Sequence, residues 1–382
     1  MLNRLSFCVS YNETRKFELS SALQHEDRIR HHSFCQFVFD NADFNATTLD
    51  GLNTMHVMGG IRCVTPFSSV LPQIQKSAVA PSAEEIVESS VMPIEVFDAA
   101  PLTGLSTVKF LNVDTQMYYQ ERESEQLSHL DVMFLCEKVW GANIGGWNGF
   151  MMNIHREKPY SVSSVGYLPF INLPASNYSC ILTAIQLART RIRELGLKTT
   201  IITFDQPLFV KACDIVEADV VVVLGAFHFL MSFLGCIGHL MAGSGLKEAL
   251  SLIYAPNTVE KSLSGHAYAR AVRQHMLMHE ALTHILFSRT TDFKSEEREL
   301  ILSMFASPSL NVDCINKEDT IRIVSEKLRT TMVHLTNEGP TAQLWLQYYN
   351  MITLLKNFIR AQRSGNWHLH LNCVRNMIPY FH

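Results

Sequence analysis

The sequence lacks the closely spaced cysteines that mark disulfide frameworks and zinc fingers. It contains nine cysteines, an odd number, and the two nearest in sequence are Cys213 and Cys236. Disulfide-rich secreted domains use even numbers of cysteines, and zinc modules use Cys-x-x-Cys spacing. The N-terminal stretch before Asn12 also has too few apolar residues for a secretory signal. We therefore expect an intracellular protein in a reducing compartment.

The common nucleotide-binding and hydrolase signatures are absent as well. No Gly-x-Gly-x-x-Gly opens a helix after a strand, and there is no P-loop and no Gly-x-Ser-x-Gly elbow. His279 and His284 lie five positions apart, which places them about 140° apart on a helix, whereas zinc proteases need a four-residue spacing. His275 and His279 have that spacing, but an isolated pair on a helix is usually structural. These observations exclude dinucleotide enzymes, serine hydrolases and zinc proteases of the usual kinds.

Charge is sparse in this chain. Charged residues make up 18% and hydrophobic residues 47% of the sequence, so the chain can bury a sizeable core and is not globally disordered. The formal net charge of -4 argues against a protein that coats nucleic acid or anionic membrane over its whole surface. A local basic groove remains compatible with it.

One uncharged stretch, between Asp219 and Lys247, is long enough to cross a membrane. It begins with four valines and continues through Gly225 into a glycine-spotted run. This pattern favours a buried strand followed by a buried helix. No membrane is expected as a partner, and a membrane-associated helical protein is the weakest alternative.

The pattern along the chain predicts strands first and helices afterwards, an α/β class. Strands are expected at residues 34–40, 54–65 (with a bulge at Gly59-Gly60), within 162–171, at 200–205 and at 220–224. A helix should follow Asn177, and helices should fill most of the chain beyond residue 227. We expect an irregular segment at 1–33, a core at 34–243 with a poorly defined insertion at 67–160, and a helical block at 244–382.

Two of the expected strands end at an aspartate, Asp40 and Asp205. If the strands are neighbours, the two carboxylates meet at one edge of the sheet, where ligands bind in α/β folds. Carboxylates suit Mg²⁺ or Mn²⁺, and two such ions can drive phosphoryl transfer. Asp43 is an alternative ligand, and His228 could orient a metal-bound water or a phosphate. The competing interpretation makes the aspartates turn formers and the histidine a buried residue bonded to backbone.

A basic stripe is expected near the C-terminus. Lys356, Arg360 and Arg363 follow one another at i, i+4 and i+7, on one face of the last long helix. Such a stripe could hold a phosphate backbone. It could equally be the solvated face of an amphipathic helix.

Five phrases of the sequence resemble a large set of transposon-derived animal proteins. These phrases are Phe39–Asn45, Thr54–Ile61, Thr203–Pro207, Gly225–Gly235 and Arg363–Trp367. The set is similar to the RNase H-like transposases that include the Kyakuja–Dileera–Zisupton group. The resemblance implies an RNase H-like mixed-sheet core with an Asp-Asp-Glu triad, two divalent metals and an all-helical insertion after the fifth strand. Asp40 would match the first acid and Asp205 the second.

The third acid of that triad has no match. Where the related proteins have Ala-Glu-Arg, this chain has Ala361-Gln362-Arg363, and it ends at His382 where they continue into another helix. The acid is therefore lost, or it lies beyond a truncated end.

The resulting expectation is a transposon-derived protein that acts on DNA by metal-dependent phosphoryl transfer, with weak or no activity. The alternative is a non-catalytic, domesticated or decayed module that binds DNA or protein. We expect an intracellular location and keep the nucleus as an alternative, although no basic run is long enough for a nuclear signal.

Overall fold

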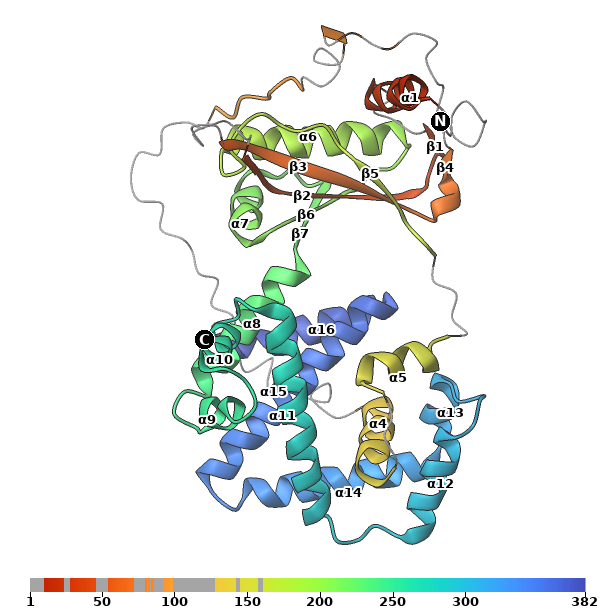
Figure 1. Cartoon of the computed structure of the whole chain (residues 1–382), viewed down its shortest axis with the longest axis vertical. Helices are drawn as coiled ribbons and strands as arrows, with labels where there is room; N and C mark the ends of the chain where they lie inside the picture. Colours follow the sequence, from red (N-terminus) through yellow and green to blue (C-terminus); the bar gives the residue numbers. More distant parts are fainter. Residues whose placement is uncertain are drawn as a thin grey trace. The chain divides into compact units, whose positions relative to one another are not determined.

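The computed structural model describes residues 10–23, 28–45, 54–71, 80, 82, 84–85, 92–98, 128–141, 145–156 and 161–381. The chain forms two compact units (Figure 1). The first unit comprises residues 1–107 and 161–228, and the second comprises residues 108–160 and 229–382. The predicted mixed α/β class with a helical C-terminal block is confirmed. The division falls at 228/229, whereas the sequence placed it at 243/244.

The first unit is built on a five-stranded mixed sheet in the order β5-β3-β2-β6-β7. The strands are β2 (Phe34–Asn45), β3 (Thr54–Thr65), β5 (Ser164–Tyr167), β6 (Thr200–Phe204) and β7 (Val220–Leu224). The β2–β3 and β3–β5 pairs are antiparallel, whereas β2–β6 and β6–β7 are parallel. Helix α6 (Tyr178–Glu194) connects β5 to β6, and α7 (Gln206–Ile215) connects β6 to β7.

Helices α6 and α7 cover one face of this sheet. Phe37 and Phe39 of β2 are buried beside Ile202 and Phe204 of β6, and the rings of Phe39 and Phe204 stack 6.0 Å apart. The α6 side of this core consists of apolar residues at helical spacing: Cys180, Ile181, Ala184, Ile185, Ala188 and Ile192. Alternate residues point to the other face, where Val221 is 47% exposed.

The predicted bulge at Gly59-Gly60 is wrong. Strands β2 and β3 pair without interruption from Phe34↔Thr65 to Asn45↔Thr54. Gly60 lies directly opposite Phe39, and a Cβ atom at Gly60 would approach Phe39 Cε1 to 2.5 Å. Gly60 is needed because the Phe39 ring occupies the space that a side chain at position 60 would fill. The glycine does not interrupt the pairing of β2 with β3.

The prediction of an irregular 1–33 segment is wrong in part. Residues Tyr11–Leu23 form helix α1, and β1 (Arg28–Ile29) pairs antiparallel with β4 (Val70–Leu71), which follows the short helix η2 (Phe67–Ser69). The uncharged run after Asp219 divides as predicted, into β7 and helix α8 (Ala226–Leu240). Within the described residues, no helix has the length and apolarity needed to cross a membrane.

The second unit is helical. Its long helices are α11 (Tyr268–Arg289), α14 (Asp319–Thr336) and α15 (Pro340–Ser364), in the part of the chain beyond residue 227 where helices are predicted. The others are α4 (His129–Trp140), α5 (Trp147–Ile154), α9 (Leu246–Ser251), α10 (Pro256–Leu263), α12 (Ser295–Phe305), α13 (Val312–Lys317), α16 (Trp367–Met377) and η4 (Ile378–Phe381). Helices α4 and α5 come from the stretch that the sequence left undefined. Helix α15 is the centre of this unit, since Tyr348, Tyr349 and every residue from Met351 to Ala361 are buried.

Two buried histidines join α11 to α15. His275 Nδ1 lies 2.9 Å from the Tyr348 hydroxyl, and His279 Nε2 lies 3.0 Å from Thr353 Oγ1. The His279 ring also stacks on Tyr349 with centroids 4.1 Å apart. This His pair, at the four-residue spacing noted in the sequence, therefore serves packing between helices.

These histidines should make the helical unit sensitive to acid. Burial lowers the pKa of His275 to about 4 and holds that of His279 well below its ordinary value, with the Lys356 charge adding to the effect. A histidine in the unfolded chain has a pKa of about 6.5. The neutral buried histidines therefore contribute their full stability to the folded unit above that pH, and this contribution is lost as the pH falls towards 4. The free energy of unfolding should fall by at most about 1.4 kcal/mol per pH unit for each histidine.

Tryptophan fluorescence during urea unfolding measures this, because all four tryptophans lie in the second unit. His275→Gln should give a shallower pH slope than the wild type, whereas His284→Gln, at an exposed site on the same helix, should not. Equal slopes in the two variants would contradict the assignment.

Gly60→Ala should destabilise the sheet by about 1–3 kcal/mol, the usual cost of overpacking, because the new methyl group meets the Phe39 ring. Gly166→Ala on β5 is the matched control, since its Cβ would meet only the end of the Arg62 side chain, 3.2 Å away. Hydrogen exchange of the β2 and β3 amides reports on this unit. Unchanged protection in Gly60→Ala would show that the Phe39 ring moves aside at no cost.

Candidate functional site

The two predicted aspartates lie on or directly after two neighbouring parallel strands, β2 and β6. Gln36, Phe37 and Val38 of β2 pair in parallel with Ile201, Ile202 and Thr203 of β6. This pairing ends two residues before each aspartate, at Val38 and Thr203.

The expectation that the first strand ends at Asp40 is wrong, because β2 continues to Asn45 and Asp40 pairs with Gly59 within it. Phe37 and Phe39 are buried beneath α6 and α7, so the alternation of β2 places Asp40 on the other face. Asp205 follows the last residue of β6 and is the N-cap of α7. Neighbouring strands lie about 4.8 Å apart. Asp40 and Asp205 therefore belong to neighbouring segments of the chain at the β2–β6 pair.

Each carboxylate makes a local backbone hydrogen bond through Oδ1. Asp40 accepts one from the Asn41 N–H at 2.7 Å, and Asp205 accepts one from the Leu208 N–H at 3.1 Å as the N-cap of α7. The turn-forming interpretation therefore holds for Asp205 as a local role. Within the described part of the chain, the Oδ2 atom of neither residue has a hydrogen-bond partner, so a ligand role is compatible with the local one.

Asp43 does not join Asp40. It lies three residues further along the same strand, and the alternation of β2 directs it to the opposite face. Its carboxylate is 2.7 Å from His56 Nδ1, its cross-strand partner, and accepts a hydrogen bond from Asn41 Nδ2 at 2.9 Å. Asp43 thus belongs to a surface pair on β2 and β3.

His228 lies in the first turn of α8, shortly after the end of β7. The Gly225 N–H donates to the Phe204 carbonyl at 2.8 Å, so the chain leaves β7 beside the end of β6 and then starts α8. The His228 ring is half-buried and meets Phe227 edge-on, with centroids 5.4 Å apart. Among the described residues there is no group of three or more His, Cys, Asp or Glu side chains that could hold a metal.

Gln362 stands where the resemblance described above has a glutamate in Ala-Glu-Arg. It is exposed near the end of α15, and its amide Nε2 lies 2.5 Å from His370 Nδ1 on α16.

The predicted basic stripe on α15 is wrong for two of its three members. Lys356 is 2% exposed and Arg360 is 9% exposed. Both form ion pairs with Asp131 of α4, at 3.2 and 3.3 Å. Only Arg363 is exposed, and its Nη1 donates to Asn148 Oδ1 on α5. Buried, paired side chains cannot contact a phosphate backbone as a surface stripe does.

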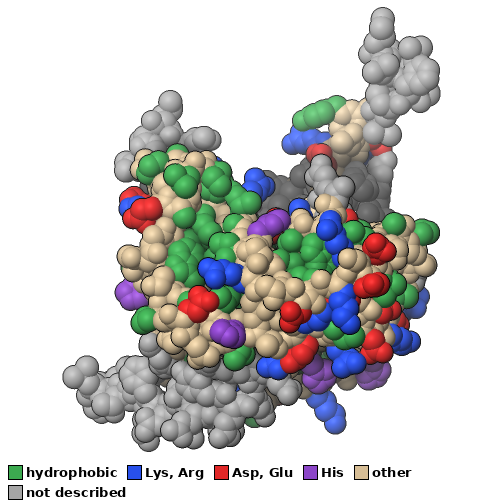
Figure 2. All heavy atoms as spheres, turned by 90° about the horizontal axis from the view of Figure 1, so that it is seen from below, with side chains coloured by type: hydrophobic (Ala, Val, Ile, Leu, Met, Phe, Trp, Pro, Cys, Tyr) green, Lys and Arg blue, Asp and Glu red, His purple; other side chains and the backbone are tan. Residues whose placement is uncertain are grey.

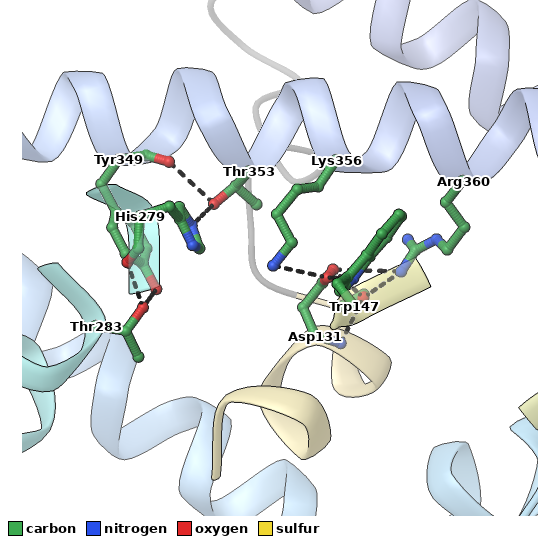
Figure 3. A network of polar contacts seen from close by, with 9 residues as sticks. Asp131, Trp147, His279, Thr283, Tyr349, Thr353, Lys356 and Arg360 are labelled. Atoms are coloured by element: carbon green, nitrogen blue, oxygen red, sulfur yellow. Dashed lines mark hydrogen bonds and ion pairs between the residues drawn. The ribbon is translucent and has the colours of Figure 1, made fainter. Parts of the chain in front are cut away.

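Asp131 is the anion at the centre of this arrangement (Figure 3). It is fully buried, and it accepts hydrogen bonds from Ser128 Oγ at 2.6 Å and from the Trp147 indole N–H at 3.0 Å. We call Asp131, Trp147, Lys356 and Arg360 the Asp131 cluster. Burial raises the pKa of Asp131, but Lys356, Arg360 and the two hydrogen bonds more than offset this and hold the pKa well below its ordinary value.

Sequence reasoning missed Asp131 and Trp147, although a signal was present. Asp131 stands within an apolar run, His129–Cys136, and Lys356 and Arg360 interrupt another, Met351–Ala361. A helix that is apolar on all sides is buried, and charges inside it must find partners. Both runs therefore indicate a buried ion cluster.

Comparison with known proteins gave one match. Residues 146–382, more than half of the chain, match the model of a family described as Domain of unknown function (DUF8702). The matched range starts at the N-cap of α5 and includes β5, β6, β7 and the helices that follow them. No curated protein and no solved structure matches the chain. The chain belongs to the DUF8702 family.

Proposed function

We propose that the first unit is an RNase H-like core of a transposon-derived protein, whose ancestral activity is metal-dependent strand cleavage and joining of DNA. The observation that supports the proposal is that Asp40 lies on β2 while Asp205 directly follows β6, the strand that pairs with β2 in parallel. The order β5-β3-β2-β6-β7 supports it, with antiparallel pairs on one side of β2 and parallel pairs on the other.

The donor set fits a hard divalent cation. Carboxylate oxygens are the protein ligands that Mg²⁺ and Mn²⁺ prefer, and Mg²⁺ is usually held by one or two carboxylates plus substrate phosphate oxygens. Asp40 and Asp205 supply two carboxylates, each with Oδ1 bonded locally. When bound, such an ion polarises a phosphoryl oxygen and lowers the pKa of water.

The residues of the chain position these ligands. The cap bond to the Leu208 N–H fixes the Asp205 carboxylate, and the Asn41 N–H fixes that of Asp40. His228 starts a helix beside the end of β6, where its imidazole could orient a phosphate or a water. With two acids in place of three, the geometry is under-determined, and phosphoryl transfer should be weak.

A non-catalytic, domesticated or decayed module that binds DNA or protein is the second candidate. It is favoured by Gln362 at the position of the expected third acid and by the absence of a three-ligand metal group among the residues that the structure describes. We expect such a module, like the active form, to bind DNA and to reside inside the cell, with the nucleus as an alternative location.

Calorimetric titration with Mn²⁺ tests the proposed site. Asp40→Asn and Asp205→Asn should each weaken binding at least about tenfold, a loss of roughly 1.4 kcal/mol. Asparagine retains the N-cap function, so Asp205→Asn removes charge without removing the cap. Asp43→Asn, on the opposite face of the same strand, should bind Mn²⁺ as the wild type does. Wild-type-like binding in Asp40→Asn would refute the site.

A DNA cleavage assay in Mn²⁺ separates the two candidates. Strand cleavage that is lost in Asp40→Asn supports the catalytic form. DNA binding that weakens with salt, survives Asp40→Asn and occurs without cleavage supports the binding module.

A further inference from the structure

The helical unit contains a pocket lined by three arginines. The pocket has a volume of about 230 Å³. It lies between the C-terminal part of α15 and the segment formed by α5 and the two residues that follow α5. Arg156, Arg360 and Arg363 line it together with Trp147 and Met151. No acidic side chain is among its lining residues. We propose that this pocket binds a phosphate group of single-stranded DNA, an assignment that rests on the proposed action on DNA.

Arg360 forms the buried wall of the pocket. It is nine-tenths buried, and its Nη1 donates to Asp131 Oδ2 and Ser128 Oγ. A guanidinium has five N–H donors in a planar fork, so one edge can hold Asp131 while the other serves a second anion. The carboxylate fixes the side chain before any ligand arrives, which lowers the entropic cost of binding.

The buried charge of the Asp131 cluster is unbalanced. Lys356 and Arg360 contribute two positive charges against the single carboxylate of Asp131 (Figure 3). Within the described part of the chain, no other acidic group pairs with these two cations. An uncompensated charge in a protein interior is costly, and an anion in the adjoining pocket would reduce that cost.

The two exposed arginines of the pocket, Arg156 and Arg363, are bonded to neutral partners. Arg363 Nη1 donates to the Asn148 amide oxygen, and Arg156 Nη2 donates to the Pro308 carbonyl. Both partners are neutral, so each guanidinium is oriented without being neutralised. Neither arginine has an ion pair with an acid among the described residues.

Some exposed arginines elsewhere on this unit are paired with acids. On α14, Arg322 pairs with Asp319 and Arg329 pairs with Glu326. The face shown in Figure 2 likewise mixes Lys and Arg with Asp and Glu side chains. The arginine pocket is therefore a local concentration of unneutralised positive charge in a chain of net charge -4.

The remaining wall of the pocket is apolar, and this indicates what kind of molecule the bound phosphate belongs to. Trp147, Met151 and Met152 line the pocket beside the arginines. Pockets for drug-sized ligands measure about 300–1,000 Å³, so a cavity of about 230 Å³ suits one phosphate with its sugar and excludes a dinucleotide cofactor. Stacking and apolar contacts to successive nucleotides are the usual complement to a basic groove for single strands.

The test is the fluorescence anisotropy of a 5′-phosphorylated, single-stranded oligonucleotide, titrated with the full chain in EDTA. Arg363→Gln and Arg156→Gln should each weaken binding about tenfold and lower the salt slope by about one. Arg329→Gln, at an exposed arginine on the same unit, is the matched control and should leave binding unchanged. Unchanged tryptophan emission and thermal midpoint check the folding of the three variants.

Two competitors define the ligand. The unphosphorylated oligonucleotide, which keeps its internal phosphates, should still compete, and inorganic phosphate should compete only at far higher concentration. Equal binding of Arg363→Gln and Arg329→Gln, or equal competition by inorganic phosphate, overturns the proposal. Because no metal is present, Asp40→Asn should bind the oligonucleotide as the wild type does, so failure of this proposal and failure of the metal site are distinguishable.

Discussion

The parallel pairing of β2 with β6, at one fixed register, is the constraint on which the account of this protein depends. It brings β2, which carries Asp40, beside β6, which Asp205 directly follows, and a slip of one residue would direct the Asp40 carboxylate to the face covered by α6 and α7. The register is held by burial of the alternate residues. Phe39 stacks on Phe204, and both rings require the core face. Gly60 on the other side of β2 contributes by leaving room for the Phe39 ring.

A second buried constraint organises the helical unit. Asp131 is fully buried and joins α4, α5 and α15 through one carboxylate, which accepts bonds from Trp147 and pairs with Lys356 and Arg360. Removing a partner from a buried ion pair costs more than the pair contributes, so this arrangement tolerates little change. The same cluster holds Arg360 in place at the wall of the arginine pocket, so one carboxylate both stabilises the unit and prepares a site.

The local elements of this fold could be predicted from the sequence, whereas the tertiary partners could not. Strands β3 and β7 and helices α11, α14 and α15 follow from hydrophobic periodicity and from the turn residues between them. Helix α1 was missed because its polar sequence carries no apolar stripe. The bulge at Gly59-Gly60 was wrong because glycine in a strand can signal either a bulge or a close contact, and the Phe39 ring that decides between them is on another strand. The stripe of Lys356 and Arg360 was misassigned because their partner lies 229 positions from Arg360 in the chain.

The central claim is that Asp40 and Asp205 form one metal site, and the most direct test is anomalous diffraction from crystals soaked in Mn²⁺. The account predicts a peak within about 2.0–2.3 Å of a carboxylate oxygen from each of the two residues, the range of oxygen–metal bonds for small divalent cations. A peak bound instead to Asp43 and His56, or ligands from only one of the two strands, would contradict it.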